Sequence, residues 1–358
     1  MKRYGYIYEK VCDLDNIKDA IRRASLGKRG QTRVKRILDH IDASAIEIRD
    51  ALIDQTFVPS QPKVKTIIAG PSGKTRTICK PAFFPDQVVH WALMLQLEPV
   101  MMTGMYAHNC GSVPGRGSSH GQKVLRKWLD CDRKNTRYCL KMDVRKFYPS
   151  IKGEHLKPYF RRKIKDSKCL WLIDSIIDSF DGQPIGYYTS QWFANFFLQD
   201  LDHFVKEGLG AAYYIRYVDD LVILGPNKKK LHRMRASVES FLNAKGLHLK
   251  GDWQVFPVRS RDIDFLGMRF YRDKTTLRKR TALRIRRRVS RVAKKGRLSV
   301  RDAAAIISYW GWIKHTDSYA FYHKYVRPIV AIREARRVVS ADARARIRAD
   351  RRRRVATG

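Results

Sequence analysis

The stretch YYIRYVDDLVIL, residues 213–224, places two adjacent acids, Asp219 and Asp220, between two apolar, strand-forming halves. Adjacent carboxylates repel each other, so apolar strands carry them only in a solvated turn or around a bound cation. Both flanking halves are apolar enough for a protein core, which would anchor the turn in the interior. The pattern leaves two interpretations open, a surface turn and a cation site.

A third acid ends a second predicted strand. Asp143 follows the short strand predicted over residues 138–142, and residues 144–148, Val-Arg-Lys-Phe-Tyr, come directly after it. Carboxylates from separate strands are hard oxygen ligands that suit Mg²⁺, which binds through one or two carboxylates plus substrate phosphates. Two such ions, about 3.5–4 Å apart, can activate a 3′-hydroxyl group and stabilise a leaving pyrophosphate. The three acids are therefore candidate ligands of two Mg²⁺ ions, with Mn²⁺ as an alternative metal.

The composition narrows the class of protein. The 358 residues include 73 Lys or Arg and 34 Asp or Glu, a formal net charge of +39, and 44% are apolar, which is enough to build a core. No apolar run approaches the roughly 18–20 residues of a membrane span, and no signal peptide is evident. The six cysteines contain no CxxC pair, which argues against a zinc site and for a reducing compartment. We expect a cytoplasmic protein with no membrane partner that binds a polyanion such as nucleic acid.

Positive charge is concentrated in the last quarter of the chain, where residues 271–358 contain 27 Lys or Arg against 6 Asp or Glu. Residues 278–295 predict a helix with Ile285, Val289 and Val292 on one side and arginines round the rest. Five arginines in eight residues, without one acid, favour contact with phosphates over a merely solvated face: Arg284, Arg286, Arg287, Arg288 and Arg291. Residues 333–354 predict either a solvated helix or a disordered tail.

The first 135 residues contain further local signals. Residues up to about 60 show the spacing of amphipathic helices, and residues 64–81 alternate around a Gly70–Gly73 turn, which predicts a hairpin. Asp86 is a candidate N-cap for a helix that carries Val88 and Val89.

Five short motifs, in chain order, resemble those of reverse transcriptases. Residues 217–220, Tyr-Val-Asp-Asp, are similar to the YxDD box, and residues 140–148 are similar to the first catalytic-acid motif. Residues 74–76, Lys-Thr-Arg, resemble the fingers element that holds the incoming triphosphate, and residues 265–267 resemble the primer-grip hairpin. Residues 185–191 fit IGxxxSQ, where most members have QGxxxSP. The resemblance spans roughly residues 60–320 and implies an RNA-directed DNA polymerase, a nucleotidyltransferase.

The resemblance also implies a fold. It is the α+β right-hand polymerase fold, with fingers, a palm made of an antiparallel sheet flanked by helices, and a helical thumb. The expected divisions are a helical N-terminal region over 1–60, fingers over 61–135, a palm over 136–272 with an inserted fingers segment around 152–184, a thumb over 273–332, and a basic C-terminal tail over 333–358.

Site roles follow from the same resemblance. Asp143 and Asp219 would ligate both metals, with Asp220 as the neighbouring acid and the Val144 carbonyl assisting. Tyr148 would stack under the sugar and exclude a 2′-hydroxyl group, the alternative being a core aromatic residue. The implied nucleotide-binding residues are Lys74, Arg76, Arg145, Lys146, Phe147, Tyr148, Ile185, Gly186 and Gln191, and the nucleic-acid-binding residues are Arg284, Arg287, Arg288 and Arg291.

Two positions depart from the usual family pattern. Ile185 stands where other members have a nucleotide-contacting Gln, which is consistent with poorer base discrimination. The lysine that usually follows the YxDD hairpin aligns with Trp253, while Lys250 lies nearby. Either Lys250 donates a proton to pyrophosphate or that role is absent, so Lys250 is left out of the predicted catalytic residues.

The IGxxxSQ form, the loop 111–117 and the ending 309–312 together most resemble the reverse transcriptase of a diversity-generating retroelement. That subtype implies mutagenic retrohoming, in which a template-repeat RNA is copied from a DNA or RNA primer with errors mainly at adenines. It also implies a small basic oligomeric accessory protein and a bacterial or phage-infected host cell. The alternatives are a defence-associated or group II intron-like bacterial reverse transcriptase and, in another class, a non-catalytic nucleic-acid-binding scaffold.

Overall fold

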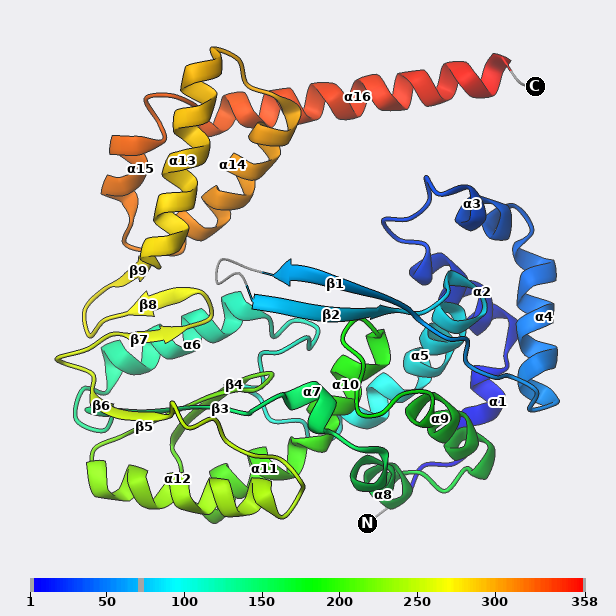
Figure 1. The fold of residues 1–358 in the computed structure, drawn as a ribbon, viewed down its shortest axis with the longest axis horizontal. Coiled ribbons are helices and arrows are strands. Elements are labelled where there is room, and N and C mark those ends of the chain that lie inside the picture. The colour runs from blue at the N-terminus through cyan, green and yellow to red at the C-terminus, as the bar shows by residue number, and fades with distance from the viewer. Residues whose placement is uncertain (1–2, 70–73, 357–358) are drawn as a thin grey trace. The chain divides into compact units, whose positions relative to one another are not determined.

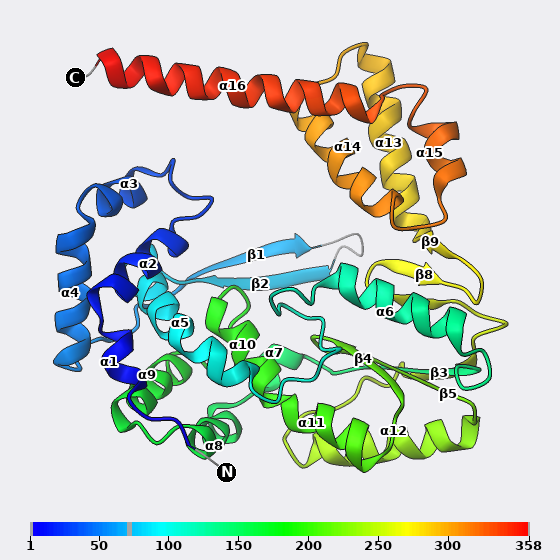
Figure 2. The ribbon, with the colours of Figure 1, turned by 180° about the vertical axis from the view of Figure 1, so that it is seen from behind.

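The computed structural model describes residues 3–69 and 74–356 (Figure 1; Figure 2 is the reverse view). The chain divides into two compact units, Met1–Leu125 with Lys134–Phe256, and Arg126–Arg133 with Pro257–Gly358. Helices combined with antiparallel sheets give the α+β class expected from the sequence. Among the residues described, no helix is long and apolar enough to span a bilayer.

Short amphipathic helices open the first unit: α1 (Ile7–Val11), α2 (Leu14–Ala24), α3 (Thr32–Asp39) and α4 (Ile41–Ile53). Helix α2 begins where it does because the Asp13 carboxylate accepts a hydrogen bond from the Asn16 backbone N–H at 3.0 Å. Its residues at three- and four-residue spacing, Ile17, Ala20, Ile21 and Ala24, are buried, and the helix packs against α5 (Val88–Met102). The helices predicted for this region are confirmed.

The predicted hairpin is also present, as β1 (Lys63–Ala69) and β2 (Lys74–Lys80), which pair antiparallel with Lys63 opposite Lys80. Its turn, residues 70–73, lies outside the described residues. The Cys79 N–H donates to the Ile185 carbonyl at 2.8 Å, which fixes the base of the hairpin to the segment before α10 (Tyr188–Phe197). Gly186 permits this approach, because its φ is 117° and a Cβ there would lie 2.4 Å from the Cys79 carbonyl oxygen.

The start of α5 differs from the prediction. The π-helical turn η1 (Phe83–Gln87) precedes α5. The N-cap of α5 is Gln87, whose side chain makes no capping hydrogen bond. The Asp86 carboxylate instead accepts hydrogen bonds from the backbone N–H and the hydroxyl of Ser60, each at 2.8 Å. The predicted cap is wrong because a partner distant in sequence competes for the carboxylate.

A four-stranded sheet forms the centre of the first unit, in the order β4 (Tyr213–Tyr217), β5 (Asp220–Gly225), β3 (Tyr138–Asp143) and β6 (Gln254–Pro257). Strand β5 pairs antiparallel with both β3 and β4, and Leu140, Tyr214 and Ile223 are fully buried. Helix α12 (Lys228–Asn243) packs along β3 and β5 (Figure 1). The other helices of this unit are α7 (Phe147–Ser150), α8 (Gly153–Lys163), α9 (Ser167–Asp178), α11 (Gln199–His203) and η2 (Phe204–Gly208). Helix α6 (Ser118–Cys131) begins in the first unit, and its residues from Arg126 on belong to the second.

The second unit has its own small sheet and its own core. Strands β7 (Ile263–Phe265), β8 (Met268–Phe270) and β9 (Thr275–Leu277) form an antiparallel meander. The helices that follow are α13 (Lys279–Lys295), α14 (Val300–Ile313), α15 (Tyr319–Tyr325) and α16 (Ile332–Ala356). Helix α13 buries Ile285, Val289 and Val292, the stripe predicted from spacing. The C-terminal stretch, for which helix and disorder were both open, is the helix α16.

We expect Gly267→Ala to destabilise the second unit more than Gly296→Ala. Both glycines have left-handed backbones, with φ of 82° and 62°, so each variant bears about 1–2 kcal/mol of backbone strain. A Cβ on Gly267 would also lie 2.3 Å from the Trp312 ring, whereas nothing lies within 4 Å of one on Gly296. The additional loss in the free energy of unfolding should be about 1–3 kcal/mol, measured by urea denaturation. Equal losses in the two variants would contradict this packing.

Candidate active site

The paired acids lie where β4 turns into β5. Tyr217 and Asp143, on the strands at either side of β5, both stand opposite Asp220 in the sheet register. The Val144 N–H donates to the Asp219 carbonyl at 3.2 Å, which joins the end of β3 to the turn. The structure therefore brings all three predicted acids and Val144 to one end of the sheet.

Burial and mutual repulsion act on the carboxylates. Burial raises the pKa of Asp220 to about 6, an effect that Lys141 opposes and that the charges of Asp143 and Asp219 reinforce. The pKa of Asp219 is also raised, first by burial and then by Asp143, while Lys250 and Arg76 act in the opposite direction. Nearby positive charge therefore stabilises the ionised form of these carboxylates.

Lys250 supplies part of that positive charge. Its ammonium group forms a hydrogen-bonded ion pair with the Asp143 carboxylate, and its backbone N–H donates to the Asp143 carbonyl at 2.8 Å. Burial lowers the pKa of Lys250, but the bond to Asp143 and the nearby acids raise it overall. The usual family lysine aligns with Trp253, and Lys250 lies nearby in the sequence, but the sequence did not predict the contact between Lys250 and Asp143.

The donor set suits a hard divalent cation. Among the described residues, no three His, Cys, Asp or Glu side chains form a group arranged to hold a metal ion. The carboxylates of Asp143, Asp219 and Asp220 and the Val144 carbonyl nevertheless offer only oxygen donors, the type that Mg²⁺ and Mn²⁺ prefer. These residues fit the metal chemistry that the sequence implies.

Tyr148 and Arg76 lie within electrostatic range of the acids. Burial raises the pKa of Tyr148 to about 12, with a further contribution from Asp219, and Arg76 lowers the pKa of both Tyr148 and Asp219. Tyr148 lies on the short helix α7, which follows β3. Its ring contacts that of Phe147, which is buried in the core.

The remaining nucleotide-binding candidates are dispersed. The side chains of Arg145 and Lys146 are exposed, and the side chain of Lys74 lies outside the described residues. Gly186 and Gln191 line a cavity of about 310 Å³, and its lining includes none of the three acids. Two of the predicted nucleotide-binding residues therefore share this cavity.

That cavity contains residues that no local sequence pattern indicated. It is also lined by Lys28 and Lys80 from segments far apart in the chain, and by His90. His90 is buried, and neither of its ring nitrogens has a hydrogen-bond partner among the residues that the structure describes. Burial lowers the pKa of its imidazole to about 3. The imidazole is therefore neutral at physiological pH.

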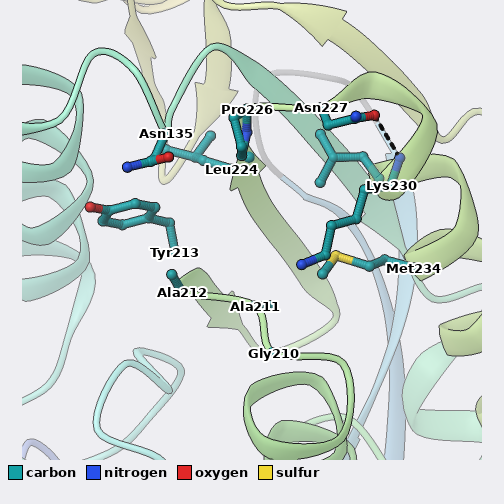
Figure 3. A pocket seen from close by; sticks show the side chains of 12 residues that line it. Asn135, Gly210, Ala211, Ala212, Tyr213, Leu224, Pro226, Asn227, Lys230 and Met234 are labelled. Carbon is teal, nitrogen blue, oxygen red and sulfur yellow. Dashed lines mark hydrogen bonds between the residues drawn. The ribbon is translucent and has the colours of Figure 1, made fainter.

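A second cavity, of about 270 Å³, lies at the other end of the strands (Figure 3). Tyr213 and Leu224, which pair with each other, line it together with Met234 of α12, and Asn227 caps that helix by accepting from the Lys230 N–H at 3.1 Å. Because Tyr213 begins the strand that Tyr217 ends, this cavity is remote from the acids along β4.

The arginines of α13 are not equivalent. Arg284, Arg287 and Arg291 are exposed, and the latter two line a surface groove of about 480 Å³ with Lys294. Arg288 is half-buried and donates to the Asp302 carboxylate at 2.7 Å, a contact within the second unit. Sequence spacing alone grouped Arg288 with the others.

An antiparallel sheet flanked by helices, with three acids at one end, is consistent with the predicted right-hand polymerase fold. Residues 62–270 match the family model described as "Reverse transcriptase (RNA-dependent DNA polymerase)". The chain therefore belongs to the reverse transcriptase family, as its motifs predict.

Relatives are found among bacterial proteins. Retron Ec73 reverse transcriptase of Escherichia coli is 29% identical over 202 residues, which cover 52% of this chain and 61% of the relative. Protein YkfC of Escherichia coli strain K12 is 22% identical over 273 residues, which cover 64% of this chain and 71% of that protein. The chain thus spans about three fifths of the retron enzyme's length.

Similar solved structures include telomerases. A C-terminally truncated apo telomerase from Candida tropicalis gives a TM-score of 0.45 at 15% identity, covering 64% of this chain and 59% of that chain. Telomerase from Candida albicans, in complex with a TWJ fragment of telomeric RNA, gives 0.46 at 12% identity, covering 75% and 55%.

Proposed function

We propose that this chain is an RNA-directed DNA polymerase that adds dNTPs to the 3′ end of a DNA or RNA primer on an RNA template. The observation that carries the proposal is the sheet register, which sets Asp143 opposite Asp220 and beside Asp219 in a member of the reverse transcriptase family.

Each residue of the acid site would have a defined task. Asp143, Asp219 and Asp220, with the Val144 carbonyl, would hold two Mg²⁺ or Mn²⁺ ions. When bound, such ions supply Lewis acidity toward the primer hydroxyl group and the leaving pyrophosphate.

Two neighbours would act on the nucleotide itself. Tyr148, close to Asp219, would limit the space for a 2′-hydroxyl group and so favour dNTPs. Arg76 would pair with the triphosphate, because a guanidinium forms strong charge-assisted hydrogen bonds with phosphate. Its influence on the pKa of Asp219 and of Tyr148 supports that placement.

We expect Asp219→Asn and Asp220→Asn each to lower kcat for primer extension by at least about 10²-fold, because each removes a negative charge from the metal-binding end of the sheet. Asp181→Asn is the matched control, since Asp181 is an exposed acid paired with Lys152. The assay is dNTP incorporation on a primed RNA template with Mg²⁺. Undiminished extension by the two variants would contradict the assigned acids, and no extension by the wild-type chain would favour the non-catalytic scaffold.

We further propose that the enzyme belongs to a diversity-generating retroelement and copies a template-repeat RNA with errors mainly at adenines. Ile185 supports this, because its apolar side chain offers no hydrogen bond at a position where other members carry Gln. A small basic oligomeric accessory protein, in the cytoplasm of a bacterial or phage-infected cell, would complete the system. The retron relative supports a second candidate, another type of bacterial reverse transcriptase, defence-associated or group II intron-like.

Sequencing of cDNA made from a base-balanced RNA template library separates the two candidates. We expect misincorporation at template adenines to exceed that at other bases by about tenfold, the size of effect that a single side-chain interaction has on discrimination. Ile185→Gln should reduce this excess, while Ile185→Leu, which stays apolar, should preserve it. Uniform errors at all four template bases would rule out the retroelement subtype and favour the second candidate.

We also propose that the exposed face of α13 tracks the phosphate backbone of the template–primer duplex. The proposal rests on Arg284, Arg287 and Arg291, which are exposed, and leaves out Arg288, whose guanidinium pairs with Asp302.

We expect Arg287→Gln with Arg291→Gln to weaken duplex binding and to reduce the salt dependence of the binding constant, by about 0.9 in logarithmic slope for each phosphate that the variant no longer neutralises. Arg288→Gln should leave the slope unchanged and lower the stability of the second unit. Fluorescence anisotropy over a salt series measures the first effect, and thermal unfolding measures the second. A smaller slope in Arg288→Gln, with no change in the Arg287→Gln/Arg291→Gln double variant, would contradict the proposal that Arg287 and Arg291 contact phosphates and Arg288 does not.

A further inference from the structure

A buried ion pair is hydrogen-bonded to the turn between β4 and β5, which contains Val218 and Asp219. Arg216 of β4 and Asp202 of α11 are both fully buried, and the guanidinium donates from Nε and Nη2 to the two carboxylate oxygens at 2.7 and 2.6 Å. Removing two charges from water is so unfavourable that a buried pair adds little net stability compared with apolar residues of similar size. A role other than stability would explain a charge at this position of an otherwise apolar strand.

The third guanidinium nitrogen contacts the turn itself. Nη1 of Arg216 donates to the Val218 carbonyl and to the Asn195 side-chain oxygen, both at 3.1 Å. Val218 lies between Tyr217 and Asp219 and has a φ of 57°, the left-handed region that a β-branched residue rarely adopts. Such a conformation persists only where the surrounding structure enforces it. The bond from Arg216 is one such restraint.

The loop around Gly111 supplies the opposing restraint. Asn195 donates to the Gly111 carbonyl at 2.6 Å, and the Cys110 N–H donates to the Arg216 carbonyl at 2.8 Å. A Cβ on Gly111 would lie 2.6 Å from the backbone nitrogen of Val218 and 2.6 Å from its Cγ2. Gly111 does not have a left-handed backbone, so glycine is needed here for space alone. The loop therefore packs directly against the strained residue of the turn.

We propose that Arg216 is a positioning residue for polymerisation. It holds Val218 in the left-handed conformation, with Asp202 orienting the guanidinium and Asn195 linking it to the Gly111 loop, and this sets the direction of Asp219 and Asp220. The proposal rests on the proposed polymerase function. It assigns to the glycine-containing loop the task of fixing the geometry of the acid site.

The first experiment compares Gly111→Ala with Gly117→Ala in the same loop. Neither glycine has a left-handed backbone, and no described residue has an atom within 4 Å of a Cβ on Gly117, so only the first change reaches the turn. We expect Gly111→Ala to lower kcat for primer extension at least tenfold with little change in KM for dNTP. The clash with Val218 should also lower the melting temperature, but the variant should remain folded at the assay temperature. Gly117→Ala should match the wild type. A wild-type kcat in Gly111→Ala would overturn the proposal.

The second experiment removes the ion pair without leaving a buried charge unpaired. The double variant Arg216→Met/Asp202→Asn contains no buried charge and keeps an acceptor for the buried Tyr214 hydroxyl, which donates to Asp202 at 2.7 Å, so it should remain folded. If Arg216 positions the turn, kcat falls at least tenfold in this folded variant. If the pair is merely structural, kcat stays at the wild-type value, and that result contradicts the proposal. The single variant Arg216→Lys should also have a low kcat, because an ammonium group cannot bond to Asp202 and Val218 in the same forked geometry.

A readout independent of activity separates this proposal from the proposed function. Hydrogen exchange followed by mass spectrometry should show faster exchange in the peptide covering residues 217–221 in Gly111→Ala and in the double variant, but not in Gly117→Ala. Absence of primer extension by the wild type would refute the polymerase function, while the exchange data would still decide whether the network restrains the turn. Unchanged exchange in both variants would refute the positioning role.

Discussion

Electrostatic repulsion among Asp143, Asp219 and Asp220 is the constraint on which the rest of the first unit depends. The antiparallel register of β3 and β5 brings these carboxylates together, and a slip of one residue would turn a strand's side chains to the opposite face of the sheet. The buried apolar residues of both strands hold the register, so the hydrophobic core makes the unfavourable cluster of charges persist. Lys250, paired with Asp143, and Lys141, acting on Asp220, offset part of the repulsion.

The buried pair of Arg216 and Asp202 has a different physical role from the cations near the three acids. Lys250 and Lys141 interact with the same carboxylates that a bound metal ion would contact. Their electrostatic contribution would therefore change when a metal ion or a triphosphate binds. Arg216 and Asp202 are sealed from solvent and paired with each other, so they act on the backbone of the turn through fixed hydrogen bonds. A low-dielectric surrounding strengthens such bonds and makes their geometry specific.

Periodic and adjacent features were predictable from the sequence. The strands around the acids, the β1–β2 hairpin and the buried stripe of α13 depend on side-chain alternation within short windows, and the structure has all of them. Features that depend on a distant partner were not predictable. Asp86 bonds to Ser60 instead of capping α5, and Arg288 pairs with Asp302 although Arg284, Arg287 and Arg291 of the same helix are exposed. Gly186 and Gln191 likewise line a cavity with Lys28 and Lys80, which come from distant segments of the chain.

By itself the sequence determined the fold class and the family, and it predicted the three acids as the site, because strand alternation and short motifs are written in neighbouring residues. Only the tertiary structure decided which polar groups from distant segments meet. The contacts of Lys250 with Asp143, of Arg216 with Asp202, and of Asn195 with Gly111 join separate elements. Chain packing sets such contacts, and no local pattern encodes them, because a charged side chain has the same local sequence whether it faces solvent or a buried partner.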